Sequence, residues 1–119
     1  MFKLVNPVQV WWPATAQVPS TDKPGTFDGQ PFKLLLEPLS ADEAEAMDKA
    51  WLALTAEDRV RDPHYLLRRV VKGWDDVTDG GSPVPFTPEN LNVALRFPWF
   101  PLAAYAAYRD LMSGGRQGN

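Results

Sequence analysis

The sequence runs Val71-Lys72-Gly73-Trp74-Asp75-Asp76-Val77 and then, after an acidic glycine-rich stretch, Pro83-Val84-Pro85-Phe86-Thr87-Pro88-Glu89. The first run predicts a packed element that ends at the Gly-Trp pair. Asp79–Ser82 predicts a turn, and Thr87-Pro88-Glu89 predicts a helix start, with a cap, a first-turn proline and an early acid. We find no group in this segment suited to covalent chemistry. This favours a protein that presents surfaces over an enzyme.

The chain has 119 residues, a formal net charge of −3 and no cysteine. This length predicts one domain, over residues 1–112, followed by a flexible Gly-rich tail over 113–119. The lack of cysteine excludes a disulfide framework, a thiolate metal site and a Cys nucleophile. A mildly acidic chain with dispersed Lys and Arg is a poor candidate for nucleic-acid binding.

The N-terminus lacks the pattern of a signal peptide, and the longest apolar stretch, residues 97–107, is too short to span a bilayer. We therefore expect a soluble, intracellular protein.

The first third of the chain predicts short extended pieces joined by turns, because several of the twelve prolines lie there. Alternating apolar residues predict a strand over Lys3–Trp12, and Phe32–Glu37 predicts a second strand that Pro38 stops. The polar segment Ala14–Gln30 predicts a loop or a mobile hairpin connection.

The middle of the chain predicts helices. Ser40-Ala41-Asp42-Glu43 is a capping box that begins a helix of about residues 41–54, and Thr55 and Asp58 predict a further capped turn. Asp62-Pro63 predicts the start of a second helix. Its apolar face would include Leu66, Leu67, Val70 and Val71. A strand is the alternative for Leu66–Val71, and Gly73 would end the element.

Two helices are expected near the C-terminus. The first begins at Thr87-Pro88, with Leu91, Ala94 and Leu95 on its apolar side, and Phe97–Pro101 breaks it. The last covers about residues 102–112. The fold class is therefore predicted as α+β, with a small antiparallel sheet from the N-terminal strands packed by three to four helices.

Tests for chemistry favour a non-enzyme. The only histidine, His64, would lie in an exposed first helical turn, where a cationic ring is mildly disfavoured. The acidic stretch 75–80 fails as a calcium loop, since Val77 and Phe86 occupy positions that need oxygen ligands. Its acids are better explained as solvating a turn. Gly80-Gly81 lacks the continuation of a phosphate-binding loop. We predict no catalytic residue, no cofactor and no metal ligand.

The five tryptophans are the compositional outlier. Trp11 and Trp12 are neighbours, so in a strand their side chains point to opposite faces. Either both faces of the sheet are covered, or one Trp contacts a partner; ordinary core residues and interface residues stay open as explanations. The residues predicted to contact a partner are Trp11, Trp99, Phe100 and Tyr108. Trp99→Ala or Phe100→Ala is expected to weaken partner binding more than stability.

The run Val70–Val77, with Asp79-Gly80 and Pro83–Leu91, resembles tail assembly chaperones of long-tailed bacteriophages and prophages. In that family a Gly-Trp-x-x-Val run leads through an acidic turn into Pro-Val-Pro-Phe-Ser/Thr-x-Glu-x-Leu. Ala103–Tyr108 and the ending Gly115–Asn119 look like the family's last helix and Gly/Arg tail. The resemblance covers about residues 31–119 and includes no catalytic fingerprint.

The resemblance implies a non-enzymatic assembly factor that binds the tape measure protein and helps recruit tail tube subunits. Such a protein works in the cytoplasm of the bacterial host and is absent from the mature virion. A homo-oligomer is compatible with this role, whereas nucleic acid and membranes are not expected partners. The resemblance also implies structural roles for the motif residues Gly73, Trp74, Pro85, Phe86 and Pro88.

Two alternatives belong to other classes. A structural minor tail or head–tail joining protein would form a ring and remain in the virion. A small enzyme or ligand-binding domain would need a deep pocket lined by His64 and acidic residues.

Overall fold

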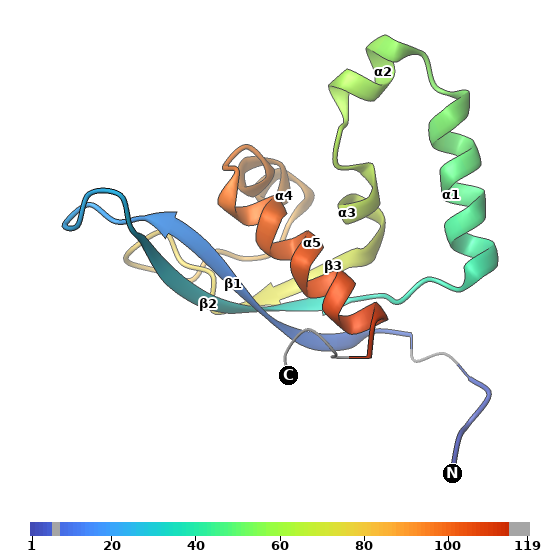
Figure 1. The fold of residues 1–119 in the computed structure, drawn as a ribbon, viewed down its shortest axis with the longest axis horizontal. Helices are drawn as coiled ribbons and strands as arrows, with labels where there is room; N and C mark the ends of the chain where they lie inside the picture. Colours follow the sequence, from blue (N-terminus) through green and yellow to red (C-terminus); the bar gives the residue numbers. More distant parts are fainter. Residues whose placement is uncertain (6–7, 115–119) are drawn as a thin grey trace.

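The computed structural model describes residues 1–5 and 8–114. It has an α+β fold in which helices pack on a three-stranded antiparallel sheet of order β1-β2-β3 (Figure 1). The predicted fold class is confirmed, although the described residues form five helices rather than three or four. The elements in chain order are β1 (Val10–Pro19), β2 (Phe27–Leu36), α1 (Ala41–Ala53), α2 (Ala56–Arg61), α3 (Tyr65–Val70), β3 (Val71–Asp75), α4 (Pro88–Leu95) and α5 (Trp99–Met112).

Strands β1 and β2 form one long hairpin, paired from Val10↔Leu36 to Pro19↔Phe27. Of the loop or hairpin connection predicted over Ala14–Gln30, the hairpin is present but the extent is wrong, because only residues 20–26 connect the strands. Small apolar side chains explain the error. Ala14 and Ala16 are buried while Pro13, Thr15 and Gln17 are exposed, which is a strand alternation without large hydrophobic residues. The strand predicted over Lys3–Trp12 begins only at Val10, and residues 6–7 of that prediction lie outside the described ones.

Proline has no backbone N–H to donate. The prolines of this hairpin lie where no neighbouring strand would accept a hydrogen bond from one. Pro13 and Pro19 belong to β1, which is an edge strand. Pro31 belongs to the central strand β2, but β3 pairs only with Lys33–Leu36 and leaves that part of β2 free.

The segment Leu66–Val71, predicted as a helix with a strand as the alternative, is helical except for Val71, which begins the third strand. Tyr65–Val70 is helical, and the chain then passes directly into β3, where Trp74 pairs with Leu34 and Gly73 with Leu35. Gly73 thus lies inside a strand and does not end the element, which corrects the prediction. Lys72 is the extra residue of an irregularity in this pairing.

Gly73 leaves room for a tryptophan on the outer face of the sheet. A Cβ atom added to Gly73 would lie 3.4 Å from the Cβ of Leu35 and 4.0 Å from the ring of Trp11. Trp11 is 52% exposed on this outer face. Trp12 faces the other way, and its Nε1 donates a hydrogen bond to Asp110 Oδ2 of α5 at 3.1 Å. The two adjacent Trp side chains point to opposite faces, as the strand geometry requires.

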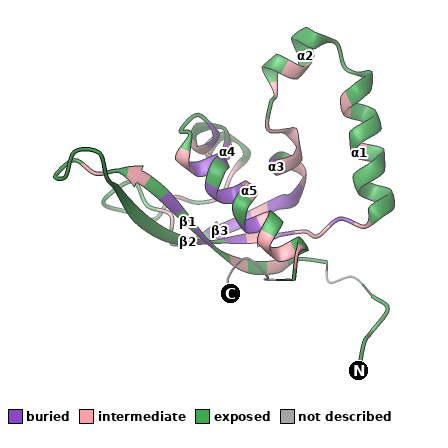
Figure 2. Ribbon diagram, in the orientation of Figure 1, coloured by how far each residue is buried: buried purple, intermediate pink, exposed green. Residues whose placement is uncertain are grey.

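Helix α5 lies across the inner face of the sheet and closes the core (Figure 2). Phe100 is central to this packing, with its ring stacked on Phe32 at 5.7 Å and edge-on to Trp74 at 5.9 Å. The helix begins at Trp99, three residues before the predicted start at Leu102. Pro101 is tolerated in its first turn because the N–H groups there have no partner within the helix. The start of α4 was predicted correctly, because Thr87 caps this helix by accepting from the Asn90 N–H at 3.0 Å.

Helices α1 and α2 form an arm, residues 41–61, that arches away from the sheet (Figure 1). Neither helix contains a buried residue, and both are mostly exposed in Figure 2. The radius of gyration is 15.8 Å, against about 13.5 Å for a compact domain of this length. The arm therefore gains little from hydrophobic burial.

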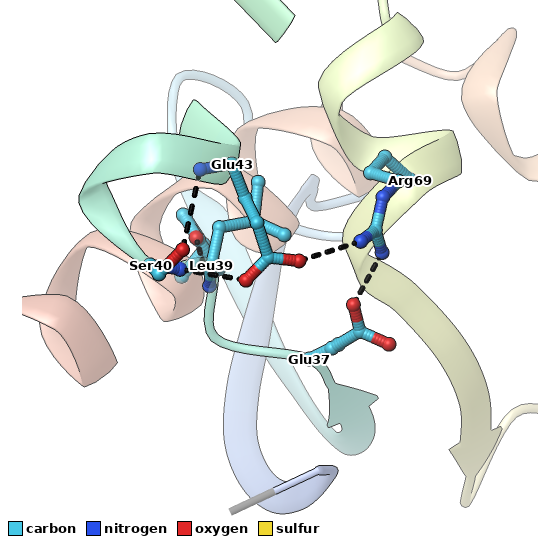
Figure 3. A network of polar contacts seen from close by, with 6 residues as sticks. Glu37, Leu39, Ser40, Glu43 and Arg69 are labelled. Carbon is cyan, nitrogen blue, oxygen red and sulfur yellow. Dashed lines mark hydrogen bonds and ion pairs between the residues drawn. The ribbon is translucent and has the colours of Figure 1, made fainter. Parts of the chain in front are cut away.

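Local polar contacts shape the arm. The capping box of Ser40 and Glu43 is present, as predicted, and Thr55 caps α2 through the Asp58 N–H. Arg69 of α3 joins the base of the arm to the end of β2 by pairing with Glu43 and with Glu37 (Figure 3).

The predicted start of the next helix at Asp62-Pro63 is wrong. Asp62 closes α2 instead, since its N–H donates to the Asp58 carbonyl at 3.3 Å. Helix α3 begins only at Tyr65.

None of the described helices is long and apolar enough to cross a bilayer. Of the predicted tail over 113–119, Ser113 and Gly114 form a turn after α5, and residues 115–119 lie outside the described part.

Candidate protein-binding groove

An open groove of about 380 Å³ lies where the hairpin, the loop of residues 76–84, α4 and the start of α5 meet. Its buried lining comes from Ala16 and three aromatic core residues, Phe32, Trp74 and Phe100. Val93 and Phe97 line it as well, and these are 50% and 48% exposed. The groove thus joins the hydrophobic core to apolar side chains that water reaches.

The motif that carried the family resemblance builds one side of this groove. Trp74 Nε1 donates to the carbonyl of Val84 at 2.8 Å, and the Val84 N–H donates to the carbonyl of Val77 at 2.8 Å. Phe86 packs edge-on against Trp74 with ring centroids 5.1 Å apart. These contacts fold the acidic turn and the Pro-Val-Pro segment back over the end of β3. Trp74, Val77 and Val84 all line the groove.

The other side of the groove is formed by the break between α4 and α5. Phe97 stacks on Trp99 with ring centroids 5.7 Å apart and an angle of 23° between the planes. The backbone fixes Phe97 in this position, because its N–H donates to Ala94 and its carbonyl accepts from Phe100. The exposed ring is therefore supported by a rigid turn.

The acidic turn supplies the charge at the groove. Asp76 and Asp79 line it, and no Lys, Arg or His is among the described lining residues. Asp79 Oδ1 accepts from the N–H groups of Ser82 and Gly81, both at 3.0 Å, and these bonds hold the pKa of Asp79 below its ordinary value. Asp76 adopts φ = 63° and pairs with the exposed Lys33 at 3.5 Å.

The structure separates the predicted partner contacts. Trp99 and Phe100 both line the groove, whereas Trp11 lies on the outer face of the sheet. Tyr108 is half-buried on α5, where its hydroxyl accepts from the Leu39 N–H at 3.2 Å. Phe100 is only 8% exposed and belongs to the core. The burial of Phe100 means that Phe100→Ala is expected to lower stability as well as any partner binding.

Val93 and Phe97 were not predicted from the sequence as surface residues of this groove. Val93 lies beside the buried Leu91 and Leu95 on the same short helix but is half exposed, so it falls outside the buried stripe. An apolar residue outside the buried stripe of a short helix was the available signal. Phe97 was assigned only to a helix break.

A second hollow, of about 340 Å³, lies between the arm and the helices α3 and α5. Trp51 of the arm stacks on Tyr65 of α3 at 5.0 Å, and both line the hollow with Tyr105 and Tyr108. Burial, and secondly the charge of Asp62, raise the pKa of Tyr105. Its side chain lies between the hollow and His64.

His64 does not occupy the exposed position predicted for it. It is half-buried, and its Nδ1 lies 3.0 Å from the Tyr105 hydroxyl. It lines neither the groove nor the second hollow. Within residues 1–5 and 8–114, no three His, Asp or Glu side chains are grouped so that they could hold a metal ion.

Comparisons with protein-family models, curated proteins and solved structures find no match for this chain. Its own residues and their arrangement therefore carry the functional argument.

Proposed function

We propose that this protein is a non-enzymatic tail assembly chaperone, which binds the tape measure protein of a long-tailed phage and helps recruit tail tube subunits. The groove is the observation that carries the proposal. Several residues through which the sequence resembles that family line this groove, among them Trp74, Val77 and Val84, and Phe86 packs against Trp74.

The chemistry of the groove suits such a client. A long helical protein exposes apolar side chains until the tube encloses it, and a groove with apolar walls and a polar edge can cover some of them. Each covered Leu- or Phe-sized side chain contributes on the order of 1.5–3 kcal/mol before the costs of association. A groove of about 380 Å³ accepts only a few such side chains. This favours reversible binding, which agrees with a protein of the host cytoplasm that is absent from the finished virion.

The test is co-expression with the tape measure protein encoded by the same genome, followed by size-exclusion chromatography with light scattering. We expect a soluble complex of fixed stoichiometry from a tape measure protein that aggregates alone. Phe97→Ser should weaken this complex at least tenfold without changing the melting temperature by more than a few degrees, because Phe97 is half exposed. Val60→Ser, at a 79% exposed position of α2 outside the groove, is the matched control and should bind normally.

Two results would contradict the proposal. One is elution of the protein alone as a closed ring while the tape measure protein stays insoluble. The other is its presence in purified tails, which would favour a structural minor tail or head–tail joining protein.

A further inference from the structure

We infer that the groove selects apolar segments that carry lysine or arginine next to their apolar side chains. This rests on the proposed function in one respect, since it assigns a partner chemistry to the same groove. It goes further by predicting which apolar segments of a client are bound and which are rejected.

The first support is the charge of the lining. Both ionisable groups that line the groove, Asp76 and Asp79, are acids. Covering them with an apolar or acidic partner would leave carboxylates desolvated or facing like charge, and both are unfavourable. A partner amine or guanidinium compensates them.

The second support is that these carboxylates are held in place. Asp79 is fixed by the Gly81 and Ser82 amides, which also favour its charged form. The backbone of Asp76 occupies the left-handed region at φ = 63°, and its N–H donates to Asp75 Oδ1 at 2.9 Å. Both acids therefore lie on an ordered turn rather than on a freely moving loop.

The third support is that Lys33, which pairs with Asp76, is not among the described residues that line the groove. Lys33 contacts Asp76 at 3.5 Å, and the two side chains are 55% and 58% exposed. An exposed pair of this kind is weak, so an incoming base can replace Lys33 without a large penalty.

The arrangement also sets a pattern for the bound segment. The acids lie on the loop of residues 76–84, while the half-exposed apolar residues Val93 and Phe97 belong to α4 and the turn after it. A segment that contacts both places its apolar side chains on Phe97 and its basic side chains beside the acidic turn. An amphipathic helix with basic residues flanking its apolar stripe meets this requirement.

The inference can be tested with two labelled synthetic helical peptides of equal length and the same Leu/Ala stripe. One has lysine flanking the stripe and the other has glutamate. Fluorescence anisotropy with the full chain at low salt should show the lysine peptide binding about three- to tenfold more tightly, the range expected for two exposed charge contacts. The ratio should approach one at roughly 0.5 M NaCl, where charges are screened over a few ångströms.

Variants test which side chains cause the preference for the lysine peptide. The double variant Asp76→Asn/Asp79→Asn should remove the preference for lysine, because Asn keeps the shape, tolerates positive φ and can still accept the turn hydrogen bonds. Glu45→Gln/Glu57→Gln changes the net charge equally on the exposed arm and should leave the preference intact. Phe97→Ser should weaken both peptides.

Equal binding of the two peptides, or equal loss of preference in the arm control, would overturn the inference. So would self-association of the chain that the groove acids control, because the occupant would then be a second copy. The outcomes separate this inference from the proposed function. A lysine-selective groove without a tape measure complex contradicts only the function, and a tape measure complex with no charge preference contradicts only the inference.

Discussion

The sheet with α4 and α5 and the arm formed by α1 and α2 are stabilised in different ways. The sheet and its covering helices contain most of the buried core, including Leu34, Leu36 and Ala104, which are fully inaccessible. The arm contains no buried residue. It has the clearest local helix signals in the sequence, so strong caps and helical spacing do not by themselves indicate a packed helix.

The arm is closed by an arginine and an aromatic pair. Arg59 donates to the carbonyls of Trp51 and Leu52 at 3.1 and 2.7 Å, which satisfies the C-terminal end of α1. Its guanidinium also lies 5.9 Å from the centre of the Trp51 ring. These contacts bend α2 back toward α1, but they leave the arm attached to the remainder mainly through Trp51, Tyr65 and Arg69.

The largest effect is expected in the core. Phe100→Ala removes the ring between Phe32 and Trp74 and should lower the free energy of unfolding by about 3–5 kcal/mol in urea denaturation. Leu102→Ala on the exposed side of the same helix should change it by less than about 0.5 kcal/mol. A loss of under about 1 kcal/mol for Phe100→Ala would show that the buried Phe100 contributes little more to stability than the exposed Leu102.

A smaller effect is expected on the outer face of the sheet. Gly73→Val should destabilise the protein by about 1–3 kcal/mol and shift the emission of Trp11, because the two methyl groups of Val extend beyond a Cβ that would already contact Leu35 at 3.4 Å and the Trp11 ring at 4.0 Å. Gly81→Ala, whose added Cβ has only an ordinary contact at 3.8 Å, is the control. Unchanged emission and stability in Gly73→Val would contradict the close approach of Trp11.

A local effect is expected in the arm. Trp51→Ala removes the stack on Tyr65 and should speed hydrogen exchange of the α1 and α2 amides about tenfold, which corresponds to about 1.4 kcal/mol for a partly exposed aromatic pair. The denaturation midpoint of the sheet should be the same in Trp51→Ala and in the parent protein, within experimental error. If the exchange of β2 amides accelerated equally, the arm would be part of the same cooperative unit.

The smallest effect is a pH dependence at the base of the arm. The Ser40 backbone and side-chain hydrogen bonds, with a lesser contribution from Arg69, lower the pKa of Glu43 from its ordinary value of 4.5. Stabilisation from a lowered carboxyl pKa is fully present above 4.5 and is lost as the pH falls through the lower folded value. Protection of the α1 amides from hydrogen exchange should therefore decrease as the pH falls through the lowered pKa of Glu43. Glu43→Gln should abolish this decrease. A decrease that persists in Glu43→Gln would assign it to another carboxyl.

Local signals predicted the three helix starts that carry a side-chain cap, but not those of α3 and α5. Ser40, Thr55 and Thr87 each cap the helix that follows them, and each bond joins residues three apart in the chain. Such interactions depend on neighbours in sequence and need no tertiary partner. The hairpin over residues 14–30 was not predictable in this way because Ala14 and Ala16 give no pattern of large hydrophobic residues. The strand Val71–Asp75 was not predictable because its pairing partners in β2 lie far along the chain.

The candidate groove shows the same division between features that local sequence predicts and features that depend on tertiary contacts. The aromatic residues and the acidic turn could be identified from the sequence, as could the opposite directions of Trp11 and Trp12. The sequence did not show that Phe100 would be core while Phe97, three residues earlier, would be half exposed.

The sequence by itself determined the α+β composition, the capped helix starts and the acidic turn, because each follows from local backbone chemistry or from the period of apolar residues. Only the tertiary structure decided that Val71–Asp75 would join β2, that α1 and α2 would project as an arm, and that Trp74, Val93 and Phe97 would meet in one groove. These outcomes depend on contacts between distant segments, and the relative free energies of such contacts are not written in any one stretch of the chain.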